Sequence, residues 1–71
     1  HMDKDNLRFT VTYSDGSDGG QMTTETFRMI NLKKGKRPEW IEQIIDQIIK
    51  DGYYTGPFGT KYELQIRHDG I

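Results

Sequence analysis

Residues 38–52 carry the feature that most constrains the fold. Their large apolar side chains recur at helical spacing, so at about 100° per residue they fill one half of a helix and the polar residues fill the other half. Pro38 suits the first helical position, and Gly52 suits the position just after the last. We therefore expect one amphipathic helix whose apolar face must be covered by a sheet, by a second copy of the chain, or by both. The apolar residues are Trp40, Ile41, Ile44, Ile45, Ile48 and Ile49.

The chain has 71 residues and no cysteine, so neither disulfides nor thiolate metal sites can stabilise it. We expect a single domain over residues 1–71, with residues 1–2 left from cloning and residues 3–6 flexible. Association with a second copy is the remaining way to strengthen so small a core. The sequence therefore predicts a homodimer.

Ten basic and eleven acidic residues give a formal charge of −1. Such a balance lacks the positive field of a typical protein that binds double-stranded nucleic acid, and it indicates no class of partner. No apolar run approaches the roughly 20 residues that a membrane-spanning helix needs. We expect a cytoplasmic protein without a membrane partner.

Alternating apolar and polar residues predict strands on both sides of the helix. Residues 7–13 alternate strictly, and residues 61–68 do so again. Residues 14–20 are rich in glycine, serine and aspartate and predict a hairpin loop, with a returning strand over 21–32. In that returning segment Phe27 and Met29 occupy odd positions, whereas Ile30 and Leu32 occupy even ones. A strand would need a bulge to bury both pairs on the same face.

These elements predict an α+β fold, in the order ββαβ, with one amphipathic helix on one face of a three- or four-stranded sheet. Residues 53–55 are the candidate fourth strand, followed by a turn at 56–59. If the last strand lies beside the first, a helical crossover would make that pair parallel. The opposite sheet face should be polar and solvated, and its expected residues are Arg8, Thr10, Thr12, Thr24, Glu63, Gln65 and Arg67.

Two features could carry chemistry, but each has a simpler structural explanation. Asp15 and Asp18 have the spacing of half a calcium loop, yet Thr26 stands where a bidentate glutamate would be needed, so a hairpin turn is the better interpretation. His68 is the single histidine outside the cloning remnant, and Asp69 is its neighbour. It lies near a C-terminus that we expect to fray, whereas a general base must be held rigidly against its substrate. We expect no catalytic residue, no metal site and no cofactor.

The basic loop before the helix is a candidate anion site. Positive side chains next to a helix N-terminus favour phosphate or a nucleic-acid backbone, although such a loop is more often simply solvated. Acidic residues at Glu39 and Glu42 also begin to cancel the field within one turn. The basic residues are Lys33, Lys34, Lys36 and Arg37.

Aromatic residues near the helix ends and the final turn are candidates for a partner surface, since aromatic rings anchor interfaces and stack on bases. Tyr62 is expected in the core. The candidate partner-binding residues are Trp40, Tyr53, Tyr54 and Phe58, with Phe58 the strongest.

The function that the sequence favours is a small, non-enzymatic protein-interaction module acting through a hydrophobic and aromatic surface. Small proteins of this build are frequent among phage and mobile-element products that inhibit a host factor, and this protein could be one of them. That suggestion rests on how common such products are and on no motif in the sequence. One alternative is a nucleic-acid-binding accessory protein that uses the basic loop 33–37. Another is capture of a nucleotide or other small ligand between protomers.

Overall fold

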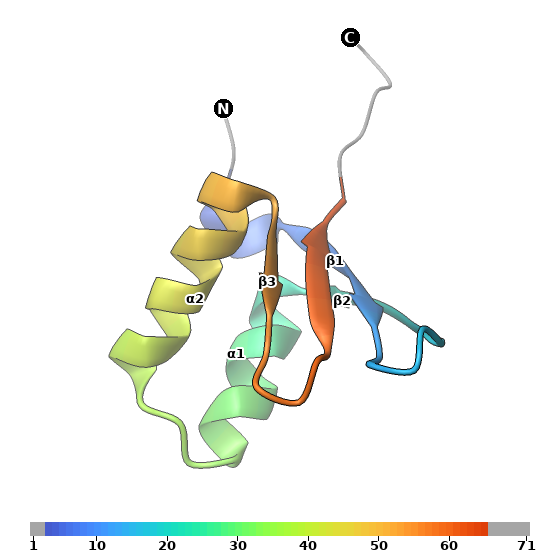
Figure 1. Cartoon of the computed structure of the whole chain (residues 1–71). Helices are drawn as coiled ribbons and strands as arrows, with labels where there is room; N and C mark the ends of the chain where they lie inside the picture. Colours follow the sequence, from blue (N-terminus) through green and yellow to red (C-terminus); the bar gives the residue numbers. More distant parts are fainter. Residues whose placement is uncertain (1–2, 66–71) are drawn as a thin grey trace, which may run out of the picture.

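The computed structural model describes residues 3–65, which form a four-stranded antiparallel sheet with two helices on one face (Figure 1). The strands are β1 (Arg8–Thr12), β2 (Asp18–Thr23), β3 (Tyr53–Thr55) and β4 (Lys61–Leu64), in the spatial order β2-β1-β4-β3. The helices are η1 (Lys4–Asn6, a 3-10 turn), α1 (Thr24–Lys33) and α2 (Pro38–Asp51). The predicted α+β class is confirmed, and so is the short strand at 53–55.

The segment predicted as a long second strand is the main correction. Only Asp18–Thr23 is a strand, and the chain then forms the helix α1. The Thr23 hydroxyl accepts a hydrogen bond from the amide of Thr26 at 3.2 Å, which caps the helix N-terminus. Gly35, with φ of 83°, follows its end. The mixed parity of residues 27–32 is therefore helical periodicity, and no strand bulge is present there.

The predicted helix over 38–52 is confirmed as α2. Pro38 occupies its first turn, and Gly52 ends it with φ of 87° while donating its amide to the carbonyl of Ile48 at 2.7 Å. Four isoleucines on its inner face are at most 4% exposed, and Ile49 is half-buried against the same core. The four are Ile41, Ile44, Ile45 and Ile48.

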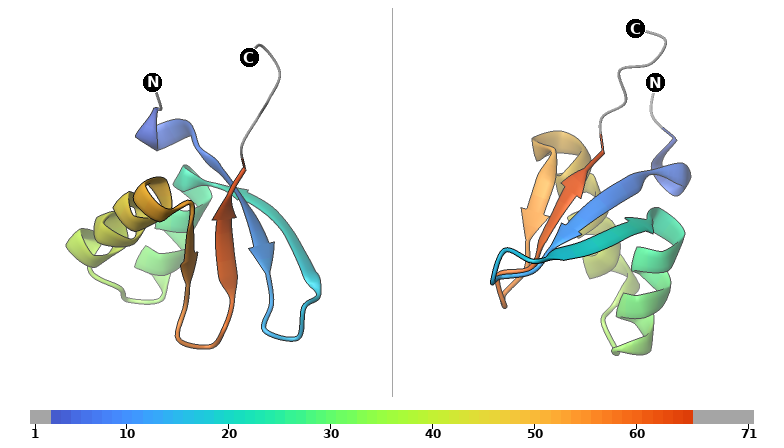
Figure 2. Two further views of the ribbon diagram at one scale, coloured as in Figure 1. Left: turned by 45° about the horizontal axis from the view of Figure 1, so that its top comes forward. Right: turned by 90° about the vertical axis from the view of Figure 1, so that its right-hand side faces the viewer.

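The chain itself covers this apolar face. Phe9 of β1, Phe27 of α1 and Leu64 of β4 join the isoleucines in one core cluster, and Phe9 and Phe27 are almost fully buried. Figure 2 shows both helices on the same side of the sheet. Of the coverings that the sequence allowed, the sheet together with α1 is therefore sufficient, and the isoleucine face of α2 needs no second copy of the chain.

β1 and β4 are neighbours but run antiparallel, not parallel as the sequence suggested. After the two helices the chain first forms β3 at the sheet edge and then reverses through a tight turn into β4. This additional reversal gives β4 the opposite direction to β1. Residues 66–68 of the predicted final strand lie outside the described residues.

The sheet face away from the helices is polar, as predicted. Arg8, Glu63 and Gln65 are exposed there, and Thr10 and Thr12 are half-buried. Thr24 was wrongly placed on this face: it lies in α1, fully buried, with its hydroxyl accepting a hydrogen bond from the amide of Leu7 at 3.1 Å. Arg67, also expected on this face, lies outside the described residues.

A hairpin loop joins β1 and β2, as predicted, but it covers residues 13–17, and residues 18–20 of the predicted loop already belong to β2. The Asp15 carboxylate accepts hydrogen bonds from both the amide and the hydroxyl of Ser17, at 2.8 and 2.6 Å, and these bonds lower the pKa of Asp15. The Asp18 carboxylate accepts from the amide of Gly20 at 2.8 Å. Both carboxylates thus stabilise the backbone of the turn.

The start of the described chain is held against the helices. Lys4 in η1 forms ion pairs with Glu42 at 3.3 Å and Asp46 at 2.8 Å. Arg28 of α1 makes a bidentate contact with Glu42, and it also pairs with Asp5. Within residues 3–65, neither α1 nor α2 has the length and apolar character that crossing a membrane would require.

Candidate functional site

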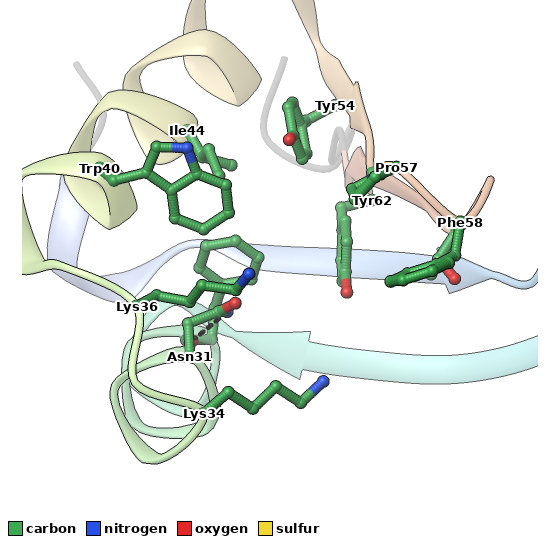
Figure 3. Close-up of a pocket in the computed structure, with 12 residues that line it drawn as sticks. Asn31, Lys34, Lys36, Trp40, Ile44, Tyr54, Pro57, Phe58 and Tyr62 are labelled. Carbon is green, nitrogen blue, oxygen red and sulfur yellow. Dashed lines mark hydrogen bonds between the residues drawn. The ribbon is translucent and has the colours of Figure 1, made fainter.

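A hollow of about 190 Å³ opens between the α1–α2 loop and the β3–β4 turn, and we call it the aromatic groove. Figure 3 shows Trp40 on one side, Tyr62 and Phe58 on the other, and two lysines extending from the loop between α1 and α2. Its rings come from Phe27, Trp40, Tyr54, Phe58 and Tyr62, and its charges come from Lys34 and Lys36.

The floor of the aromatic groove is part of the core. Phe27 packs edge to face against Phe9 at 5.9 Å and against Tyr62 at 5.2 Å between ring centroids. Burial raises the pKa of the Tyr62 hydroxyl, so Tyr62 stays neutral over the physiological range. The floor is therefore a fixed and uncharged surface.

The two lysines are positioned by the loop that joins the helices. The backbone amide of Lys34 donates to the carbonyl of Ile30 at 3.1 Å, and that of Lys36 donates to the carbonyl of Asn31 at 3.0 Å. The Lys36 ammonium lies 5.1 Å from the centroid of the Trp40 ring, within cation–π range. The loop thus brings two positive charges to one rim of the aromatic groove.

Phe58 forms the opposite rim and is 87% exposed. It lies in the β3–β4 turn, which is closed by hydrogen bonds from Gly56 to Thr60 at 2.8 Å and from Gly59 to Gly56 at 3.0 Å. Gly59 has φ of 83°, a conformation that favours glycine. The most exposed large apolar side chain in residues 3–65 is therefore carried on a tight turn.

The structure brings together five of the eight candidate site residues, although the aromatic set and the basic set were predicted as separate sites. These five are Trp40, Tyr54, Phe58, Lys34 and Lys36. The other three are Tyr53, Lys33 and Arg37, and they do not line the groove.

The three remaining candidates point elsewhere for identifiable reasons. Tyr53 lies on the outer sheet face, 47% exposed, with the Lys61 ammonium 4.9 Å from its ring centroid. Arg37 pairs with Glu39 at 2.7 Å. The pKa of the Glu39 carboxyl is lowered mainly by a hydrogen bond from its own backbone amide and further by the hydrogen bond from Arg37. Lys33 ends α1 and is exposed. The basic cluster is therefore divided between the groove and open solvent.

Sequence analysis missed Phe27, Asn31 and Ile44 as lining residues. Phe27, Asn31 and Lys34 follow one another by four and three positions, which is the spacing of one helix face. A helical interpretation of residues 24–33 would have grouped them. Asn31 donates its side-chain amide to the carbonyl of Phe27 at 2.8 Å, so it is tied to its own helix.

The lining of the groove combines apolar and positively charged side chains. Lys34 and Lys36 are the charged lining residues, and the lining contains neither a carboxylate nor an imidazole. Among residues 3–65 there is no cluster of histidine and acidic side chains that could hold a metal ion. His68 lies outside the described residues. The groove therefore offers apolar contact and positive charge.

A larger hollow of about 530 Å³ lies at the other end of β1, lined by Leu7, Arg8, Asn6, Gln21 and Gln65. It has more space, but its surface is mostly polar, and it contains no aromatic ring. Apolar contact supplies most of the binding free energy in typical recognition sites. We therefore regard the smaller aromatic groove as the candidate site.

Comparison of the chain with protein-family models, with curated proteins and with solved structures found no match.

Proposed function

We propose that this chain is a non-enzymatic protein-interaction module and that the aromatic groove is its contact surface. The observation that carries the proposal is Phe58, which is 87% exposed beside a rigid aromatic floor. Aromatic side chains dominate the energetics of protein interfaces, because they bury a large area and lose little conformational freedom. A partner that covers Phe58 would remove this apolar surface from water.

The volume of the groove supports a protein partner over a free small ligand. Pockets for drug-sized molecules usually enclose about 300–1,000 Å³. The aromatic groove has about 190 Å³ and is open on one side. An engineered cavity of about 150 Å³ accepts benzene, so this volume suits one large side chain projecting from a partner.

Nucleic-acid binding is the second candidate, because Lys34 and Lys36 line the groove together with aromatic rings. Two observations weigh against it. The Lys36 ammonium lies over the half-buried ring of Trp40, so that ring face is not free for a base to stack on, and the chain carries a net charge of −1. Binding of a labelled oligothymidylate, measured at two salt concentrations, tests for nucleic-acid binding, since genuine phosphate contacts make the affinity depend steeply on salt.

Self-association remains a prediction with a narrower basis than the sequence suggested. The isoleucine face of α2 is already covered, so a dimer would have to use another surface: the aromatic groove, a sheet edge, or the exposed apolar side chains Met29, Ile30 and Leu32 of α1. Sedimentation equilibrium at tens of micromolar decides the question. A mass of one chain would remove the homodimer, whereas twice that mass, reduced by Phe58→Ala, would identify the groove as a self-interface.

Site-specific photocrosslinking tests the proposed function in the cells that carry the gene. A photoreactive phenylalanine analogue would replace Phe58 in one variant and Thr12, on the open sheet face, in a matched control. We expect discrete adducts from position 58 that resist nuclease, together with few from position 12. Adding Lys34→Glu and Lys36→Glu to the position-58 variant should reduce its adducts, and Lys33→Glu should not.

Three results would contradict the proposal. Adducts that disappear on nuclease treatment would identify nucleic acid as the partner. Adducts with the mass of two copies of this chain would identify a homodimer. Equal labelling from the groove and from the control position would show that the groove has no special contact.

A further inference from the structure

β3 forms an open edge of the sheet directly beside the aromatic groove. Within residues 3–65 no further strand pairs with it. On its inner side the ladder is well defined, because Leu64 donates its amide to the Gly52 carbonyl and Gly56 donates its amide to the Thr60 carbonyl, both at 2.8 Å. These two bonds fix which backbone groups of β3 face β4.

Hydrogen-bonded pairs alternate with non-bonded pairs along an antiparallel ladder. Tyr54 opposite Tyr62 lies midway between the two bonded ends, so it forms the next hydrogen-bonded pair. The N–H and C=O groups of Tyr53 and Thr55 therefore point away from β4. They form a short row of backbone donors and acceptors at the open edge, and both side chains are exposed.

The opposite edge strand, β2, has two features that hinder pairing with a further strand, and β3 has neither. In β2 the amide of Gly20 donates to the Asp18 carboxylate at 2.8 Å, and the β1–β2 register shifts between Val11 and Thr12. A carboxylate and a bulge are two of the devices by which proteins prevent an edge strand from pairing. The edge of β3 carries no charged side chain.

The open edge and the aromatic groove are continuous. Tyr54 of β3 lines the groove, and the chain passes from Thr55 directly into the turn that carries Phe58. Figure 1 places β3 at the side of the sheet that lies next to α2. A segment pairing with β3 would therefore run past the mouth of the groove, with Lys34 and Lys36 on its far rim.

We propose that the partner binds as an extended acidic segment that adds a fifth strand to the β3 edge and places one large apolar side chain in the aromatic groove. The inference rests on the proposed function and specifies its partner. Main-chain hydrogen bonds to Tyr53 and Thr55 would supply affinity, as in other cases of strand addition. The single anchor follows from the groove volume, and the acidic character follows from two lysines with no carboxylate in the lining.

Selection from a random library of twelve-residue peptides, displayed on phage and panned against the immobilised full chain, provides the probe. We expect enriched peptides to combine acidic residues with one large apolar residue. Their binding should fall at least tenfold with Phe58→Ala. It should be unchanged with Met29→Ala, which removes an exposed apolar side chain outside the groove.

Amide hydrogen exchange of the chain, with and without an enriched peptide, then tests the strand. The amides of Tyr53 and Thr55 should exchange at least tenfold more slowly in the complex, while that of Tyr54 should change little because it already faces β4. Methylating the peptide nitrogens that face β3 should abolish binding, whereas methylating the intervening nitrogens, which face away from β3, should not. Thr55→Pro, which removes an edge donor, should weaken binding in a variant whose folding is checked by circular dichroism.

The possible failures can be distinguished. Peptides that depend on Phe58 but leave the amides of Tyr53 and Thr55 unprotected would overturn strand addition and leave the proposed function standing. Enriched peptides without acidic residues would overturn the charge argument alone. If no enriched peptide depends on Phe58, Lys34 or Lys36, both the inference and the proposed function of the groove are overturned.

Discussion

Two apolar regions of this molecule differ in burial. The inner face of α2 contains Ile45 and Ile48, which are fully buried, whereas the aromatic groove ends in Phe58, which is 87% exposed. From the sequence, each region was a candidate for contact with a second copy of the chain or with another partner. The difference is that α1 and the sheet cover the helix face, while a tight turn holds Phe58 away from the core. An amphipathic helix thus shows where a core forms, and the exposed turn indicates where a partner could bind.

Truncation of a buried isoleucine in α2 should reduce stability more than any other change proposed below. Ile45→Ala removes a fully buried side chain and should lower the free energy of unfolding by about 2–5 kcal/mol. A domain of this size has a total of only about 3–10 kcal/mol, so the variant should be close to unfolding. Urea denaturation followed by circular dichroism measures the change. A loss under 1 kcal/mol would mean that the helix face is not packed as described.

The buried hydroxyl of Thr24 tests whether the N-terminus of α1 is part of the core. It accepts a hydrogen bond from the Leu7 amide at 3.1 Å. Thr24→Val keeps the shape but leaves that amide without its acceptor, which should cost about 1–3 kcal/mol. Thr55→Val, at an exposed position, is the matched control and should change stability by less than about 0.5 kcal/mol. Equal effects in the two variants would argue against a buried α1 N-terminus.

The ion pairs beside the core should add a smaller, pH-dependent contribution. Hydrogen bonds from Arg28 are the main cause of the lowered pKa of Glu42, which is half-buried. Because the folded-state pKa lies below the usual value of 4.5, this contribution is present above that pH. It is lost as the pH falls through the lowered pKa.

The difference in stability between the wild type and Glu42→Gln should therefore be about 0.5–1 kcal/mol at pH 7, a range kept low because the pair is partly solvated. It should shrink toward zero as the pH falls below the lowered pKa. Urea denaturation at several pH values measures the change. Glu63→Gln, on the open sheet face, serves as the control. If the stability difference between the wild type and Glu42→Gln grew as the pH fell, the pKa of Glu42 would be raised in the folded protein, and not lowered.

Phe58 should contribute least to stability. Phe58→Ala removes a side chain that is mostly in water, so the free energy of unfolding should change by less than about 0.5 kcal/mol. The same urea denaturation measures it. A loss above 1 kcal/mol would place Phe58 in the core of the single chain and would remove the reason to regard it as a contact residue.

The parts of the fold that sequence analysis predicted correctly are those with a local signal. Pro38, Gly52 and the isoleucine spacing define α2, and strict alternation defines β1 and the described part of β4. The segment 24–33 was misread because its threonines favour strands, and tertiary packing on Phe27 overrode that preference.

Only part of the candidate site was predictable in its residues, and its geometry was not predictable. Trp40, Phe58 and the loop lysines were recognised by type, yet nothing local shows that the α1–α2 loop faces the β3–β4 turn. That arrangement depends on the four-residue loop after α1, and so on a helix that was not predicted. The covering of α2 likewise depends on Phe27, which was assigned to a strand.

Relaxation of side-chain NMR signals by a soluble gadolinium chelate tests the central contrast most directly. We expect the ring protons of Phe58 to be strongly relaxed and the methyl groups of four isoleucines to be protected from the chelate, namely those of Ile41, Ile44, Ile45 and Ile48. Relaxed isoleucine methyl groups would show an uncovered helix face. A protected Phe58 ring in the isolated protein would show that the chain itself or a second copy covers it. Either result would contradict the contrast between a buried helix face and an exposed Phe58.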